Sequence, residues 1–296
     1  MTAPQRPDHA APAHPAAAKA PEPVPFGTRL HRAMDTRGPL CVGIDPHASL
    51  LASWGLTDDV AGLERFTRTV VDALADRVAV LKPQSAFFER FGSRGIAVLE
   101  RAVADARDAG ALVLMDAKRG DIGSTMGAYA AGYLQPGAPL FSDAVTVSPF
   151  LGYGSLRPAL DLARRHGCGV FVLALTSNPE GPEVQRATAA DGRSVAQVML
   201  DHLARENAGA DPLGSFGAVV GATLDRADAD LDVNGPLLAP GLGAQGATPA
   251  DLPRVFGAAA RAVLPSVSRG VLGAGPTAAG LREAADRYAS ELAANR

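Results

Sequence analysis

The residues of this 296-residue chain best suited to chemistry are three charged side chains close together, Asp116, Lys118 and Asp121. They follow the apolar run at residues 112–115, so the first carboxylate is expected where a buried strand ends. Asp116 and Lys118 are two positions apart, which places them on the same side of an extended segment. Two acids and one ammonium group at a strand end suit binding and charge-driven chemistry on a small ligand. An isolated Asp-x-Lys-x-x-Asp match can also be a solvated loop, so the rest of the chain decides.

Charge is nearly balanced across the chain, with 28 Lys and Arg residues against 31 Asp and Glu residues. There is no basic run that would predict a nucleic-acid surface, and no apolar stretch long enough to predict a membrane span. Residues 1–25 are rich in Ala and Pro and have too little apolar surface to offset the entropy of ordering, so we expect a disordered extension. This extension lacks the apolar centre of a secretory signal, which favours a cytoplasmic location.

Eight short apolar runs alternate with longer amphipathic segments, as expected for parallel strands covered by helices. The runs are residues 40–44, 78–81, 112–115, 144–147, 170–175, 217–220, 236–239 and 262–265. Helical spacing is clear in residues 60–75, 96–109 and 194–207. Beyond the extension, roughly 270 residues remain, close to the ~250 of an eightfold barrel. The sequence therefore predicts a single (β/α)8 TIM barrel, an α/β fold, over residues 26–296.

Polar residues come at the end of each apolar run. Asp45, Lys82 and Asp116 follow the first three runs, and the later runs are followed by Ser148 and by residues 176–178, 221–223, 241–245 and 268–270. The carboxyl ends of barrel strands meet at one rim, where barrel enzymes have their active sites. Lys82 alone could be a solvated loop residue and Asp45 could form an Asx turn. Eight polar segments at one rim favour an active site instead.

The loops expected after the last two strands indicate a phosphate site. Residues 240–246 form a Gly-rich turn whose backbone N–H groups could point at an anion. Arg269 follows the last strand and offers a planar fork of donors for phosphate oxygens. These two loops are the usual phosphate-binding position of an eightfold barrel. A Gly-x-Gly turn is weak evidence alone, but with Arg269 at this position it favours a phosphorylated substrate.

From about Phe26 to the C-terminus, the chain resembles the orotidine 5′-phosphate decarboxylase family, in its longer bacterial branch. The most specific marks are Asp116-Ala-Lys118-Arg-Gly-Asp121-Ile122-x-x-Thr125, with Lys82 upstream, and Pro240-Gly-Leu-Gly-Ala-Gln245-Gly, with Arg269 downstream. Three further segments are similar to that branch: Val42-Gly-Ile-Asp45-Pro46, Lys82-Pro-Gln-Ser-Ala-Phe87-Phe-Glu and Thr176-Ser-Asn-Pro-Glu-Gly181.

The resemblance implies decarboxylation of orotidine 5′-monophosphate to uridine 5′-monophosphate, the last step of de novo pyrimidine synthesis, by a carboxy-lyase that uses no cofactor and no metal. Lys118 matches the lysine that protonates C6 as carbon dioxide leaves. Asp116 matches the carboxylate beside the substrate carboxylate. Lys82 and Asp45 match groups that contact the ribose hydroxyls. An alternating array of Lys82, Asp116, Lys118 and Asp121 would hold four charges in place without reorganising water.

The remaining matches concern the two ends of the substrate and a second subunit. Ser177 matches the serine that contacts the pyrimidine, although the neighbouring Thr176 leaves this register open. Gln245 and Arg269 match the phosphate contacts. Asp121, Ile122 and Thr125 match residues lent to the site of the neighbouring subunit, so the resemblance implies a homodimer with shared active sites.

Two other functions stay open on the sequence. Sugar-phosphate decarboxylases and hexulose-phosphate synthases also carry Asp-x-Lys-x-x-Asp but require Mg²⁺, held partly by an acid near the end of the second strand. Here that strand ends in Lys82, with Glu89 seven residues later, which disfavours the metal site. A non-catalytic barrel that senses pyrimidine nucleotides is the other alternative, although a sensor has no need of a proton donor such as Lys118. The long connection at residues 178–215 and the loop at 243–249 are both candidates for a lid.

Overall fold

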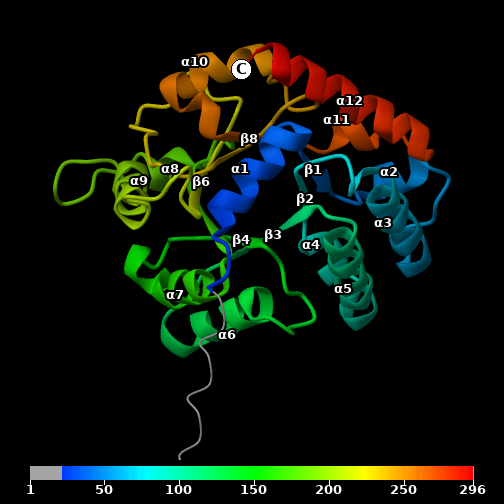
Figure 1. Cartoon of the computed structure of the whole chain (residues 1–296), viewed down its shortest axis with the longest axis horizontal. Coiled ribbons are helices and arrows are strands. Elements are labelled where there is room, and N and C mark those ends of the chain that lie inside the picture. Colours follow the sequence, from blue (N-terminus) through cyan, green and yellow to red (C-terminus); the bar gives the residue numbers. More distant parts are fainter. Residues whose placement is uncertain (1–21, 296) are drawn as a thin grey trace, which may run out of the picture.

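The structure, a computed structural model, describes residues 22–295 of the chain. Eight parallel strands hydrogen-bond in sequence order and close into a barrel, with β1 paired to β8 (Figure 1). The strands are β1 Cys41–Ile44, β2 Val80–Pro83, β3 Leu112–Arg119, β4 Ala144–Val147, β5 Gly169–Leu175, β6 Phe216–Val220, β7 Leu237–Pro240 and β8 Val263–Val267. The predicted (β/α)8 barrel is confirmed. Residues 1–21 of the expected N-terminal extension lie outside the described residues.

Helices surround the barrel and alternate with its strands (Figure 1). The α-helices are α1 Phe26–Arg37, α2 Ala48–Ser53, α3 Val60–Leu74, α4 Ala86–Glu89, α5 Gly92–Asp108, α6 Gly123–Leu134, α7 Arg157–His166, α8 Pro182–Gln185, α9 Val195–Glu206, α10 Leu252–Phe256, α11 Arg269–Leu272 and α12 Ala278–Ala294. The 3₁₀ helices are η1 Tyr153–Leu156, η2 Pro249–Asp251 and η3 Gly257–Ala262. Each of the three helices predicted from spacing is present, and no end differs from the prediction by more than four residues.

Helix α3 shows why these segments fold as they do. Asp59 caps its start: the Asp59 Oδ1 accepts a hydrogen bond of 2.8 Å from the Gly62 N–H and so satisfies one of the free donors of the first turn. Phe66, Val70 and Leu74 lie on its buried face and are fully shielded from solvent. Burial of each such side chain stabilises the fold by about 1.5–3 kcal/mol.

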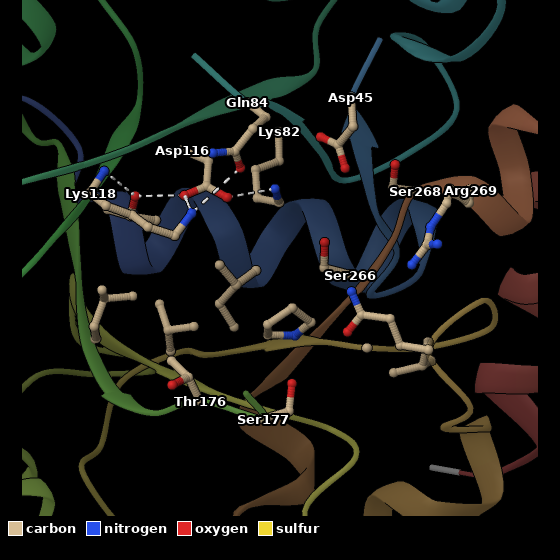
Figure 2. A pocket seen from close by; sticks show the side chains of 18 of the residues that line it. Asp45, Lys82, Gln84, Asp116, Lys118, Thr176, Ser177, Ser266, Ser268 and Arg269 are labelled. Carbon is tan, nitrogen blue, oxygen red and sulfur yellow. Dashed lines mark hydrogen bonds and ion pairs between the residues drawn. The ribbon is translucent and has the colours of Figure 1, made fainter. Parts of the chain in front are cut away.

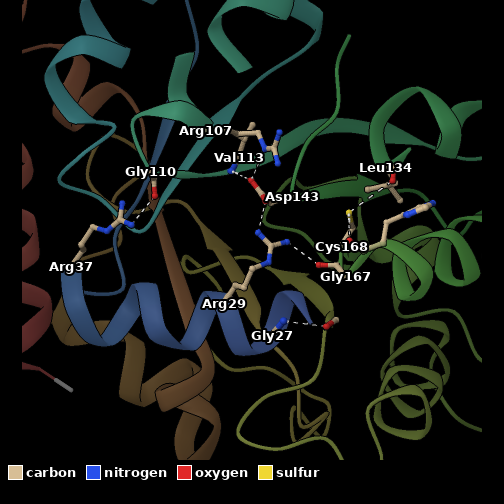
Figure 3. Close-up of polar contacts among 12 residues, drawn as sticks. Gly27, Arg29, Arg37, Arg107, Gly110, Val113, Leu134, Asp143, Gly167 and Cys168 are labelled. Carbon is tan, nitrogen blue, oxygen red and sulfur yellow. Dashed lines mark hydrogen bonds and ion pairs between the residues drawn. The ribbon is translucent and has the colours of Figure 1, made fainter. Parts of the chain in front are cut away.

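Helix α1 covers the amino-terminal opening of the barrel, on the side opposite the polar strand ends (Figures 1 and 3). Phe26 packs edge-on against Phe171 inside the barrel, with ring centroids 6.0 Å apart. Arg29 of α1 forms an ion pair with Asp143, which directly precedes β4, and donates to the carbonyl oxygen of Gly167 at 2.8 Å. Asp143 is 3% exposed, and it also accepts a 2.9 Å bond from the Val113 N–H. These contacts fix α1 to the start of β3, β4 and β5.

Two strands extend further than the apolar pattern predicts. Lys82 lies inside β2 and Asp116, Lys118 and Arg119 lie inside β3, whereas the sequence places Lys82 and Asp116 just after the strand ends. Hydrophobic periodicity marks only the apolar part of a strand, so it misses the polar residues that continue the ladder into the site. Among residues 22–295, no helix has the length and apolar character needed to cross a membrane.

Candidate active site

A cavity of about 270 Å³ opens at the carboxyl ends of the strands (Figure 2). It brings together most of the predicted site residues, from six of the eight strands or the loops that follow them: Asp45, Lys82, Asp116, Lys118, Ser177, Gln245 and Arg269. Ser268, from the predicted polar segment 268–270, also lines it, as do three side chains that sequence reasoning missed: Gln84, Thr146 and Ser266. The cavity is charged on the side of β2 and β3, and Arg269 lies on the side of β8.

Three charged side chains form a continuous chain of contacts in this cavity. The Lys82 Nζ donates to Asp116 Oδ2 at 2.8 Å, and the Lys118 Nζ donates to Asp116 Oδ1 at 2.6 Å. Lys118 Nζ also lies 3.5 Å from Gln84 Oε1. Two cations therefore share one carboxylate. The predicted four-charge array has three members within one chain, because Asp121 is not in contact with Lys118.

Burial and charge act in opposite directions on this group. Burial raises the pKa of the Asp116 carboxyl, but the nearby charges of Lys82 and Lys118 outweigh it and hold that pKa well below the usual range. Burial likewise lowers the pKa of Lys82, while Asp116 and Asp45 more than reverse this and raise it above its ordinary value. At neutral pH, Asp116 is ionised and Lys82 is protonated.

In the loop after β5, the hydroxyl groups of Thr176 and Ser177 differ in their hydrogen bonds. Gln185 of α8 accepts a 2.8 Å bond from the Thr176 N–H and donates to the Thr176 Oγ1 at 2.6 Å. The same hydroxyl donates to Asn178 Oδ1. Thr176 is thus fully engaged by its own loop, whereas the Ser177 hydroxyl makes no hydrogen bond within residues 22–295. Ser177 lines the cavity (Figure 2) and is the better candidate for ligand contact.

The loop after β7 and the start of α11 form the far end of the cavity. Gly241 and Gly243 have positive φ angles of 118° and 74°, a conformation that favours glycine and lets the turn fold back over the cavity. The Gly243 N–H donates to the Ala247 carbonyl at 2.8 Å and closes this turn. Gln245 and Arg269 are exposed at the cavity edge. Arg269 forms no ion pair with any acid in the described part of the chain, so its charge is available to an anionic ligand.

Two buried oxygen atoms in the cavity wall have no protein partner. Asp45 Oδ1 and Ser268 Oγ are both shielded from solvent and accept or donate no hydrogen bond within residues 22–295. Gly43 lies beside both residues, and a side chain there would meet the Ser268 Cβ at 2.9 Å. Buried polar atoms are nearly always paired in native proteins. Each of the two oxygen atoms therefore lacks the partner that a buried polar atom normally has.

The three residues predicted to serve a second subunit lie outside the cavity. Asp121, Ile122 and Thr125 follow β3 or start α6, and the Asp121 carboxylate accepts a 2.7 Å bond from the Ile122 N–H. The Ile122 side chain is 63% exposed. Phe150 and Leu151, which follow β4, are also exposed apolar side chains. Within the described residues, there is no cluster of three His, Cys, Asp or Glu side chains able to hold a metal ion.

Comparison with known proteins agrees with the motifs. The model of the orotidine 5′-phosphate decarboxylase / HUMPS family matches residues 38–284. A Streptomyces coelicolor protein named orotidine 5′-phosphate decarboxylase is 76% identical over 269 residues, which cover 90% of this chain and 97% of the relative. A Salinispora arenicola protein of the same name is 67% identical over 270 residues, 91% of this chain and 97% of the relative.

Solved structures give the same result. The crystal structure of a Streptomyces avermitilis protein, assigned as an orotidine 5′-phosphate decarboxylase, superposes with a TM-score of 0.91 at 71% identity. The superposition covers 95% of this chain and 99% of that protein. The resemblance read from the motifs is confirmed: the chain belongs to the orotidine 5′-phosphate decarboxylase / HUMPS family.

Proposed function

We propose that this chain is a carboxy-lyase that converts orotidine 5′-monophosphate to uridine 5′-monophosphate, the last step of de novo pyrimidine synthesis. Close relatives carry the name of this enzyme. The observation that carries the proposal is the group of Lys82, Asp116 and Lys118 in one cavity with an unpaired Arg269. A nucleotide with a carboxylate at one end and a phosphate at the other matches this distribution of charge.

Lys118 is the proposed proton donor. Loss of carbon dioxide from the substrate carboxylate leaves the electron pair of the broken C–C bond on C6. The Lys118 ammonium gives its proton to that carbon, which forms the C–H bond of the product and leaves a neutral amine. Asp116 Oδ1 lies 2.6 Å from the Lys118 Nζ and holds this side chain in place before the reaction. Fixed charges in a shielded cavity stabilise such a carbanion without reorganising solvent.

The other cavity residues bind and orient the nucleotide in this proposal. Gln245 and Arg269 bind the phosphate, and binding energy gained at that remote group can be used at the reacting carbon. Asp45 and Lys82 contact the ribose hydroxyls, which would satisfy the unpaired Asp45 Oδ1. Ser177 contacts the pyrimidine, since the hydroxyl of its neighbour Thr176 is already engaged.

The active form is proposed to be a homodimer in which each subunit completes its neighbour's site. Asp121, Ile122 and Thr125 lie outside the cavity of their own chain, where they could reach a second one. Exposed apolar side chains gather on the segments that follow β3 and β4, namely Ile122, Tyr129, Phe150 and Leu151. Such a group of exposed apolar residues is typical of an interface.

The proposed reaction requires no metal and no cofactor, because the ammonium groups of Lys82 and Lys118 supply the positive charge at the reacting centre. A cytoplasmic location stays a prediction.

Decarboxylation of orotidine 5′-monophosphate by the purified protein, followed by ultraviolet absorbance with and without EDTA, tests the function. We expect rapid turnover that EDTA does not change. Turnover abolished by EDTA would favour a Mg²⁺-dependent sugar-phosphate enzyme, and tight product binding without turnover would favour a sensor.

A further inference from the structure

The ladder between β3 and β4 is irregular where the catalytic charges lie. Met115 pairs with Val145, but the next pair joins Arg119 to Val147. The segment Asp116–Lys118 therefore has only Thr146 opposite it. Within this bulge Lys118 has a φ of 47°, in the left-handed region that non-glycine residues rarely adopt. Such a conformation is strained for a residue with a Cβ and persists only where its surroundings hold it.

The side chain of Thr146 supplies the hydrogen bonds that the irregular ladder leaves open. Its Oγ1 accepts a 3.0 Å bond from the backbone N–H of Lys118 and donates a 2.9 Å bond to Asp116 Oδ1. Thr146 is 1% exposed, so water does not compete for either bond. One hydroxyl thus holds the backbone of one charged residue and the carboxylate of the other.

We propose that Thr146 is a positioning residue for the decarboxylation, whose hydroxyl holds the Lys118 backbone and the Asp116 carboxylate in their reactive arrangement. This inference rests on the proposed function, since it assigns Thr146 a task through the two residues that act there. The Lys118 side chain is 44% exposed and its ammonium is bound mainly by Asp116 Oδ1. Without the Thr146 hydroxyl, the Asp116 carboxylate loses one of its three donors and the Lys118 backbone N–H loses its acceptor.

The chain offers a matched control in Thr67 of α3. Thr67 is also 1% exposed, but its hydroxyl makes no hydrogen bond within residues 22–295. Replacing either threonine by valine keeps nearly the same shape and removes a buried hydroxyl. The two substitutions therefore differ in whether hydrogen bonds are lost, and only one of them lies beside the catalytic charges.

The experiment compares Thr146→Val, Thr146→Ser and Thr67→Val by steady-state kinetics across pH. We expect Thr146→Val to lower kcat about 10- to 100-fold, the effect of losing hydrogen bonds to charged groups, with little change in KM. The acid limb of its kcat profile should move to higher pH, because the carboxylate loses a donor that favours its ionised form. Thr146→Ser should restore most of kcat, and Thr67→Val should leave kcat and the profile unchanged.

Hydrogen exchange of the Lys118 amide gives a readout that needs no substrate. We expect this amide to exchange at least about 10-fold faster in Thr146→Val, since its acceptor is gone, and at the normal rate in Thr67→Val. If the wild type shows no turnover while the amide behaves as expected, the proposed function fails and the positioning stands. Wild-type kcat in Thr146→Val, or an equal kcat loss in Thr146→Ser, would overturn the inference. Should Thr146→Val not fold, Thr146→Ala and Thr146→Ser make the same comparison, differing by one oxygen atom.

Discussion

The ammonium of Lys82 on β2 and the carboxylate of Asp116 on β3 form a 2.8 Å ion pair in which the two side chains are only 7% and 9% exposed. Removing one partner of such a pair costs on the order of 3 kcal/mol, because it leaves the other charge buried without full compensation. The pair therefore contributes to the stability of the fold as well as lining the cavity. Its contribution to the free energy of unfolding depends on pH.

The stabilisation from Asp116 should be lost in acid. Because Lys82 and Lys118 hold the folded pKa of Asp116 below its ordinary value of 3.8, the stabilisation is present above pH 3.8 and is lost as pH falls toward the folded pKa. We expect the difference in unfolding free energy between wild type and Asp116→Asn to be constant from about pH 5 to 8 and to shrink below about pH 4. Chemical denaturation across pH measures it. Asp58→Asn breaks an exposed pair with Arg90 and is the comparison: Arg90 also lowers the pKa of Asp58, but this exposed pair should contribute less and should weaken with added salt. A difference that stays constant down to pH 2 would contradict this prediction.

Lys118 should affect activity through its side chain and stability through its backbone conformation. Both Lys118→Ala and Lys118→Gly should reduce kcat at least about 100-fold, since each removes the proton donor. The glycine variant should nevertheless be more stable than the alanine variant by about 1 kcal/mol, because only alanine is strained at a φ of 47°. Thermal or chemical unfolding of the two proteins provides the comparison. The same pair of substitutions at Glu283, exposed within α12, should give the opposite order, since glycine weakens a helix.

Arg269 should act on the phosphate alone. Arg269→Ala is expected to lower kcat/KM for orotidine 5′-monophosphate about 10- to 100-fold, the usual range for a lost charged hydrogen bond. The same variant should process the nucleoside orotidine, which lacks the phosphate, as well as the wild type does. Measuring kcat/KM of both proteins on both substrates separates an effect on phosphate binding from an effect on the rest of the site. Equal losses on the two substrates would remove Arg269 from the phosphate site.

Shared active sites can be tested by mixing inactive proteins. Lys118→Ala and Asp121→Ala should each be inactive, because each damages both sites of its dimer. After subunit exchange at equal concentrations, half of the dimers are mixed and each has one intact site, so about a quarter of wild-type activity should return. Lys118→Ala mixed with Asp116→Asn is the control and should recover nothing, since both changes lie in the same subunit's contribution. Failure of the first mixture to recover activity, with exchange verified, would argue against lending of Asp121.

The sequence predicts the barrel and most of the cavity because both depend on local patterns. Apolar runs with helical segments between them identify the eight strands, and charged residues after those runs identify the rim. Two features escape this reasoning. The bulge in β3 arises from pairing with β4, which no single segment encodes, so the left-handed Lys118 is invisible in the sequence. Thr146 is visible in the sequence only as a polar residue within the apolar run 144–147. Its importance becomes clear only from its hydrogen bonds to Lys118 and Asp116 in the structure.

The position of helix α1 has a consequence for how molecules enter and leave. Phe26 and its neighbours fill the amino-terminal end of the barrel, and the ion pair between Arg29 and Asp143 fastens the helix there. Within residues 22–295, the cavity is therefore closed toward the amino-terminal end of the barrel and opens at the carboxyl ends of the strands. Under the proposed function, the nucleotide and carbon dioxide use the opening at the strand ends. Carbon dioxide then leaves either past the bound nucleotide product or after that product has dissociated. Release at this opening can therefore limit the turnover rate.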